Sequence, residues 1–173
     1  MRVAILIAPK DFKDESVSNA KLLFQKWNIE AVITSYSTKE CVGYHGAIYK
    51  PDINAAKLDP QNFDALFLVD GKGVEEYKLY DFRALLETVK QFSINKKPIA
   101  AINNAIKIVA RANIVSNVKI ATPQDSEIQR LVALYHGTAS RNEIEDDKGI
   151  LTLSNPEKIY EFADLLVSKL GAK

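Results

Sequence analysis

Two adjacent carboxamide side chains, Asn103 and Asn104, stand where the segment KPIAAINNAIKIVARA at residues 97–112 changes from a predicted strand to a predicted helix. In many hydrolase-like folds a nucleophile occupies such a junction, because the strained turn projects its side chain into the site. A carboxamide cannot attack a carbonyl, because the lone pair of its nitrogen is delocalised. The pair instead predicts either a ligand held by amide hydrogen bonds or a structural turn. The structural interpretation is simpler, because Asn tolerates positive φ and Asn104 could cap the helix.

A second candidate is the glycine-containing segment VDGKGVEEY, in which Asp70 precedes Gly71 and Gly73. Glycines let the backbone bend, and their N–H groups could form an anion-binding nest near a helix start. The segment is not a Walker motif, because the required spacing and the following Ser or Thr are absent. A turn without a ligand is the simpler interpretation.

Three carboxylates, Asp11, Asp14 and Glu15, follow the first predicted strand. Neighbouring carboxylates can raise one another's pKa and so create a general acid. Most such clusters simply stabilise a helix N-terminus, each carboxylate by a few tenths to about 1 kcal/mol, and this interpretation is favoured. Glu15 is the candidate acid or base, because of its place relative to the Asn103 turn.

The only cysteine, Cys41, and the two histidines, His45 and His136, are candidates for a thiolate–imidazole pair. Cys41 and His45 are expected in a loop and hairpin away from the strand ends, so their side chains need not meet. A half-buried cysteine and two surface or core histidines are therefore favoured. Because two separated histidines do not form a metal's first shell, we expect no metal site.

The elements that would position these residues follow from the hydrophobic pattern. Continuous apolar runs predict strands buried on both faces of a parallel sheet, at residues 3–8, 31–33, 65–69 and 99–102. Amphipathic segments between and after them predict helices, at residues 14–27, 81–92 and 155–170. Asp14 or Ser16 is the expected cap of the first helix.

Two further segments, 41–52 and 142–153, have the pattern of β-hairpins, the second turning at Asp147, Lys148 and Gly149. Alternating strands and helices predict one doubly wound α/β domain over residues 1–173 with hairpin excursions. Ligands of such sheets bind beyond the carboxyl ends of the strands. Those ends hold APKDFKDE, DGKG, NNA and TPQD, the last following Ile120.

The overall composition excludes several classes. The chain has 173 residues, 47% of them apolar, and a net charge of +1, so nothing favours nucleic acid or an anionic membrane. One cysteine rules out an internal disulfide. The N-terminal apolar run is too short for a secretory signal, and no run approaches the length of a membrane span. We therefore expect a cytoplasmic protein.

The order of FDALFLVDGKG, a long helix and KPIAAINNAIKIVARANIV resembles the ThiJ/PfpI family. GYHGAIYKPD is similar to that family's hairpin, and residues 146–170 to its closing hairpin and last helix. The resemblance covers nearly the whole chain. It implies a flavodoxin-like three-layer sandwich, which agrees with the pattern above, and members that often form dimers or larger rings.

The resemblance also assigns roles. Family members carry a reactive cysteine at the turn, often followed by His and Gly, and here those places are taken by Asn103, Asn104 and Ala105. The family glutamate corresponds to Glu15, or to Ser16 if the alignment shifts by one. The family's glycine loop, an oxyanion-binding element, corresponds to Asp70, Gly71 and Lys72, with Asp70 in place of the usual glycine.

Three functions follow as hypotheses. The first is a non-catalytic protein without a cofactor, which binds a small molecule or assembles as a homo-oligomer or with a paralogous subunit. The second is a cysteine-independent enzyme acting on a small carbonyl or amide, with Glu15 as base, Asn103 and Asn104 orienting substrate, and backbone donors near Gly71. The weakest is a nucleotide or flavin binder, suggested by fold analogy alone.

Overall fold

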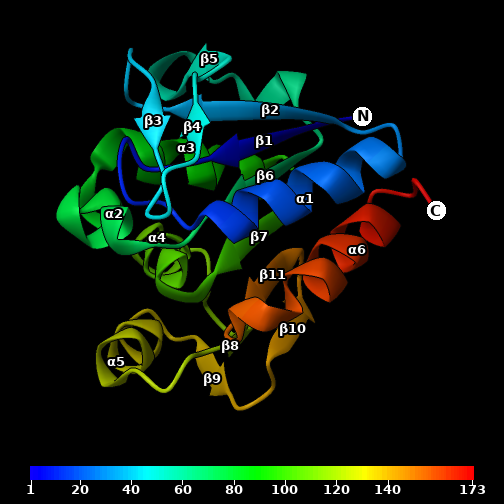
Figure 1. Ribbon diagram of the computed structural model, residues 1–173. Helices are drawn as coiled ribbons and strands as arrows, with labels where there is room; N and C mark the ends of the chain where they lie inside the picture. The colour runs from blue at the N-terminus through cyan, green and yellow to red at the C-terminus, as the bar shows by residue number, and fades with distance from the viewer.

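The computed structural model describes residues 1–173, and its centre is a seven-stranded sheet (Figure 1). The strands lie in the order β10-β11-β7-β6-β1-β2-β5, and every neighbouring pair is parallel except β10 and β11. Their bounds are β1 Arg2–Leu6, β2 Glu30–Ser35, β5 Ile53–Asn54, β6 Ala65–Leu68, β7 Ile99–Ile102, β10 Ile144–Asp147 and β11 Ile150–Leu153. The predicted flavodoxin-like, doubly wound α/β fold is confirmed.

Helices cover both faces of this sheet, which completes the three predicted layers. Helices α1 (Asp14–Lys26) and α6 (Ile159–Lys169) lie side by side on one face (Figure 1). Helices α3 (Arg83–Ile94) and α4 (Ile106–Arg111) cover the other face, with α5 (Ser126–Leu134) packed beside α4. None of these helices combines the length and the apolarity that crossing a bilayer would require.

The apolar runs of the strands supply two cores at once. Ala4 and Leu6 of β1 pack in the cluster under α3 and α4, whereas Val3 and Ile5 pack in the cluster under α1 and α6. Successive side chains of a strand point to opposite faces, so a strand covered on both sides must be apolar throughout. This is why the four predicted strands appear as continuous runs in the sequence.

Both predicted hairpins form, but the second is not an excursion. The first pairs β3 (Cys41–Val42) with β4 (Ile48–Tyr49) outside the central sheet. The second turns at Lys148 and Gly149, with φ of 51° and 83°, and its strand β11 pairs with β7 inside the central sheet. The apolar residues of β11 face both cores, so it is their burial, and not the turn, that places this strand inside the central sheet.

The strand expected before TPQD also lies elsewhere than predicted. Strand β8 (Lys119–Ala121) pairs in parallel with β9 (Thr138–Ser140) as a separate two-stranded sheet. It is tied to the central sheet by the Ala121 N–H, which donates to the Thr152 hydroxyl at 2.9 Å. The TPQD segment therefore follows a peripheral strand, and its predicted place on the rim of the central sheet is wrong.

A buried lysine links three helices on the α3–α4 face. The ammonium of Lys107 in α4 lies 2.8 Å from Glu75 of α2 (Lys72–Glu76) and 3.0 Å from Glu127 of α5. It also sits 4.9 Å from the centre of the Tyr80 ring. Burial alone would lower the pKa of Lys107, but hydrogen bonds and charges from the two glutamates outweigh it and raise the pKa. Lys107 therefore remains protonated and positively charged.

Candidate functional site

The turn after β7 has the strained conformation expected from the sequence. Asn103 follows the last residue of β7 and has φ of 47°, in the left-handed region. Asn is one of the few residues other than glycine that enters this region readily. A single 3-10 turn, Asn103–Ala105, then leads into α4. The carboxamide of Asn103 makes no hydrogen bond within the chain.

Asn104 does not cap α4 as predicted. Its side chain reaches across to the glycine loop, where its amide oxygen accepts the Gly71 N–H at 3.2 Å and its amide nitrogen donates to the Gly71 carbonyl at 2.8 Å. No side chain caps α4 or the preceding turn. The prediction failed because a neighbouring loop, invisible in the local sequence, offers the carboxamide both a donor and an acceptor.

The glycines of the DGKG segment serve close backbone packing. A Cβ on Gly71 would lie 2.5 Å from the Asp11 carbonyl oxygen, and one on Gly73 would lie 2.0 Å from that of Lys10. Gly71 also has φ of 134°, which L side chains rarely adopt. The Gly73 N–H donates to the Asp11 carbonyl at 3.1 Å. Because Gly73 and Gly71 donate within the chain, these two N–H groups do not form an open anion nest.

Asp70 is buried just after the end of β6 and paired with Ser16. The Ser16 hydroxyl donates to the Asp70 carboxyl at 2.7 Å, and the two residues are 1% and 2% exposed. Burial raises the pKa of Asp70, while the Ser16 hydrogen bond and the nearby Lys13 charge oppose the rise. Ser16 therefore points inward beside the loop, and neither Asp70 nor Ser16 is open to a ligand.

Asp14, expected as a helix cap, instead organises the loop between β3 and β4. Its two carboxylate oxygens accept the backbone N–H groups of His45 and Ala47, each at 2.8 Å. Gly43 approaches the same carboxylate so closely that a Cβ there would lie 2.3 Å from it. The first position of α1 is thus wrapped by residues 43–47, and Asp14 is about nine-tenths buried.

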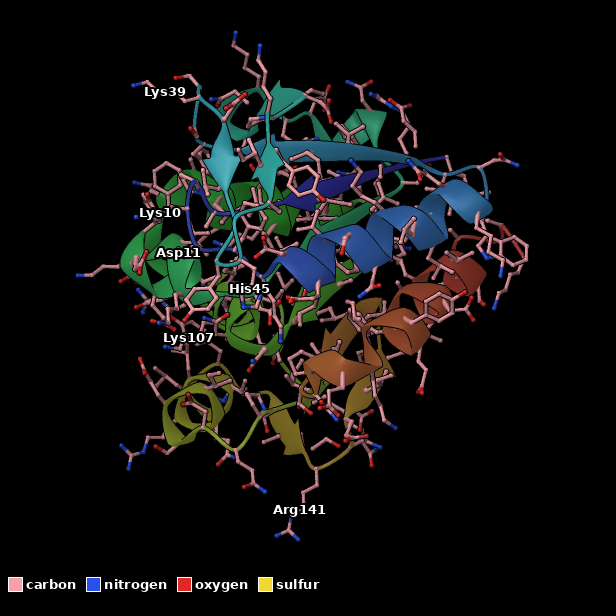
Figure 2. All side chains as sticks on the ribbon, in the orientation of Figure 1. Lys10, Asp11, Lys39, His45, Lys107 and Arg141 are labelled. Carbon is pink, nitrogen blue, oxygen red and sulfur yellow. The ribbon has the colours of Figure 1, made fainter.

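This loop brings His45 to Glu15, a pairing that the sequence analysis did not predict. The Nδ1 atom of His45 lies 2.9 Å from the Glu15 carboxylate, and Figure 2 shows His45 at the start of α1. Hydrogen bonding to its own backbone N–H lowers the pKa of Glu15. Burial opposes this change, and the hydrogen bond and charge of His45 lower the pKa further. Glu15 is thus an ionised partner for the imidazole.

The other two members of the Cys–His set lie apart from this pair. Cys41 is fully buried in β3, and its thiol faces the Lys39 carbonyl at 3.8 Å. His136 is exposed in the turn after α5, with φ of 64°. No hydrogen bond joins Cys41 to either histidine, so the chain holds no thiolate–imidazole pair.

A cavity of about 270 Å³ opens beside the Glu15–His45 pair. Its lining carries charges of both signs and two aromatic rings, the phenol of Tyr44 and the imidazole of His45: Asp11, Lys13, Asp14, Glu15, Tyr44, His45, Gly71 and Lys72. The Lys72 ammonium lies 4.8 Å from the centre of the Tyr44 ring. Of the five residues assigned to ligand binding from the sequence, Glu15 and Gly71 line the cavity. Asp70, Asn103 and Asn104 do not, although Asn104 supports the wall through Gly71.

Sequence reasoning missed Lys13 and Tyr44 as lining residues, and it named Lys72 only as part of the family's glycine loop. Lys13 and Lys72 belong to the segments APKDFKDE and DGKG, which were already expected at the carboxyl ends of strands. Their place beside the predicted site could therefore have been inferred. Tyr44 and His45 arrive from a hairpin whose docking on α1 depends on Asp14. No local pattern reveals that contact.

Comparison with known proteins gives consistent matches. Residues 1–169 match the DJ-1/PfpI family. An uncharacterised protein of Methanocaldococcus jannaschii is 28% identical over 160 residues, covering 90% of this chain and 76% of its own. A deglycase of Pyrococcus horikoshii is 29% identical over 119 residues, covering 69% of this chain and 70% of its own.

Solved structures agree at the level of the fold. A ThiJ/PfpI domain protein of Brachyspira murdochii superposes with a TM-score of 0.91 over 99% of this chain and 97% of its own, at 22% identity. A DJ-1 superfamily protein of Agrobacterium tumefaciens gives a TM-score of 0.87 over 100% and 91%, at 21% identity. At such identities the likeness establishes the architecture.

Proposed function

The chain belongs to the DJ-1/PfpI family, and from this premise we propose that it is a non-catalytic member that binds a small polar molecule in the cavity beside α1. One observation carries the proposal. The Asn104 carboxamide occupies both backbone groups of Gly71, in a turn that begins with Asn103 and has no thiol.

The missing nucleophile is the first support. A thiolate mechanism needs a thiol in surroundings that lower its pKa and leave it accessible. The only cysteine, Cys41, is fully buried in β3. Asn103 cannot replace it, because an amide nitrogen is not nucleophilic.

The occupied backbone donor is the second support. In acyl and carbonyl chemistry the loss of one oxyanion-binding donor costs about 10²–10³ in rate. The loop of Gly71 resembles the family's oxyanion-binding element, and its N–H already donates to Asn104. A substrate oxyanion would have to displace that carboxamide, which also bonds the Gly71 carbonyl.

The lining of the cavity indicates the ligand class. Asp11 and Glu15 could receive a cationic group, Lys13 and Lys72 an anionic one, and Tyr44 offers an aromatic surface. The volume of about 270 Å³ is below the range of drug-sized pockets. A free amino acid or another small zwitterion fits both the size and the charges.

Ligand binding is tested by titrating the protein with a panel of free and glycated amino acids while recording heteronuclear NMR spectra. We expect saturable chemical-shift changes at Tyr44, His45 and Lys72. The binding affinity should be weaker in Lys72→Gln and unchanged in Lys39→Gln. Saturable binding that moves none of these signals, or no binding by any small zwitterion, would reject the assigned cavity.

The absence of catalysis is tested separately, with glycated amino acids as substrates because relatives are named deglycases. We expect no turnover above the uncatalysed rate, in the wild type or in Cys41→Ala. Equal, robust turnover by both proteins would reject the non-catalytic role. Sedimentation velocity would test the other expected form of a non-catalytic role, self-association.

A second candidate function is a cysteine-independent enzyme, and the Glu15–His45 pair at 2.9 Å is the observation that favours it. An ionised carboxylate that orients an imidazole is a common arrangement for proton transfer. In this version His45 is the base and Glu15 its partner, rather than Glu15 itself as inferred from the sequence. Any turnover should then disappear in Glu15→Gln without a change in melting temperature, and a wild-type rate would reject the role.

A further inference from the structure

We propose that Asp14, Glu15 and His45 form a binding site for a divalent transition-metal ion of the zinc type. One potential ligand atom from each residue lies within 4.8 Å of the other two. The set joins two carboxylates from the start of α1 to an imidazole 30 residues away in the chain. It is therefore a product of the fold rather than a run of acidic residues.

Two of the three ligand atoms already lie near the separation found in a metal's first shell. Ligand atoms bound to one zinc ion at about 2.0–2.2 Å lie roughly 3–3.5 Å apart. The His45 Nδ1 atom and the Glu15 carboxylate are already 2.9 Å apart. Their side chains are 62% and 51% exposed, so rotation can bring both toward Asp14 without disturbing the core.

Asp14 supplies the fixed point of this site. Each of its oxygens accepts one backbone N–H, from His45 or Ala47, and keeps a second lone pair for an ion. Hydrogen bonds of this kind hold ligating carboxylates in position around bound metals. The same two bonds fold the loop that carries His45, so one carboxylate both offers a ligand and places the imidazole.

The donor set also selects the ion. One imidazole nitrogen with carboxylate oxygens suits zinc, nickel, copper or cobalt, whereas calcium and magnesium favour all-oxygen shells. The adjoining cavity leaves room for water to complete the coordination. Lys13, Lys72 and the positive end of α1 oppose a cation, so we expect micromolar rather than picomolar affinity.

Binding is measured on tag-free protein, by calorimetric titration with zinc chloride in a non-chelating buffer and by the visible absorbance of added cobalt. We expect one equivalent of zinc to bind. Glu15→Gln and His45→Ala should each weaken binding about 10- to 100-fold or more. Both side chains are largely exposed, so neither variant should unfold.

His136→Asn is the matched control, because it removes the other histidine and Asn tolerates the positive φ of that position. It should bind zinc as tightly as the wild type. The proposal fails if the wild type shows no saturable 1:1 binding, or if His45→Ala binds as the wild type does. Amino-acid binding measured with a chelator present tests the proposed function without any metal, so the two proposals can fail separately.

Discussion

The carboxamide of Asn104 pairs with Gly71 as a neighbouring strand would, accepting its N–H at 3.2 Å and donating to its carbonyl at 2.8 Å. These two bonds join the turn after β7 to the loop after β6. Loops at the rim of a parallel sheet usually leave such groups to water or a ligand. Here a side chain of the same protein satisfies them.

Asn104→Ala should therefore lower stability. The variant leaves the N–H and the carbonyl of Gly71 without partners in a half-buried place, which costs about 1–3 kcal/mol. Urea unfolding gives the free energy of unfolding. Asn103→Gly is the matched control, because glycine adopts the φ of 47° freely and no hydrogen bond is lost. A similar loss in both variants would contradict the assigned contact.

Restoring the thiol alone should not restore chemistry. In Asn103→Cys we expect a thiol that reacts with a disulfide reagent, because the left-handed turn still projects the side chain. We expect no deglycation, because Asn104 still occupies the Gly71 N–H. Turnover by this single variant would show that the occupied Gly71 N–H is no obstacle to the reaction. Asn104→Ala is the control, because it frees the Gly71 N–H without adding a thiol.

Stability should depend on pH through Asp70. Because burial raises its pKa in the folded protein, Asp70 stabilises the fold at a pH below the unfolded value of about 4. That stabilisation is lost as the pH rises through the folded pKa, where the buried carboxyl must ionise. Asp70→Asn, which can still accept the Ser16 hydroxyl, should therefore gain stability relative to the wild type as the pH rises from about 4 toward neutrality.

Urea unfolding across that pH range measures the difference. Asp11→Asn is the control, because it removes a nearby carboxylate at a positive φ that Asn tolerates. An Asp70→Asn difference that is independent of pH would mean that the carboxyl is not destabilised by burial.

The Lys107 link should respond differently when it is broken from its two sides. Lys107→Met removes the charge and fills the space, and the half-exposed glutamates can turn to water, so we expect a change within about 1.5 kcal/mol. The double variant Glu75→Gln and Glu127→Gln leaves a buried ammonium without its anions, which should cost about 3 kcal/mol. If Lys107→Met and the double variant lose equal stability on thermal unfolding, the result would argue against a buried charge on Lys107.

The layers of the fold were predictable because buried strands and amphipathic helices have characteristic patterns of apolar and polar residues in the sequence. The runs at residues 65–69 and 99–102 correspond to β6 and β7 almost residue for residue. The place of β8 was not predictable, because three residues carry too little pattern to distinguish a central strand from a peripheral one.

The site was predictable only in part. The positive φ of Asn103 follows from residue type and from its place after a buried strand. The contacts of Asn104 and Asp14 could not be predicted, because both side chains bond backbone groups more than 30 residues away. A local pattern suggests a helix cap for each residue, and tertiary structure offers better partners.

The two glycines of the DGKG loop have a consequence for reading mutational scans. Any side chain at Gly73 would drive the stretch after β1 outward and carry Asp11 and Lys13 with it. A saturation library should therefore mark both glycine positions as intolerant, although neither offers a side chain to a ligand. Intolerance at these positions would reflect the close packing of the DGKG backbone against the segment after β1, and should not be interpreted as evidence of ligand binding.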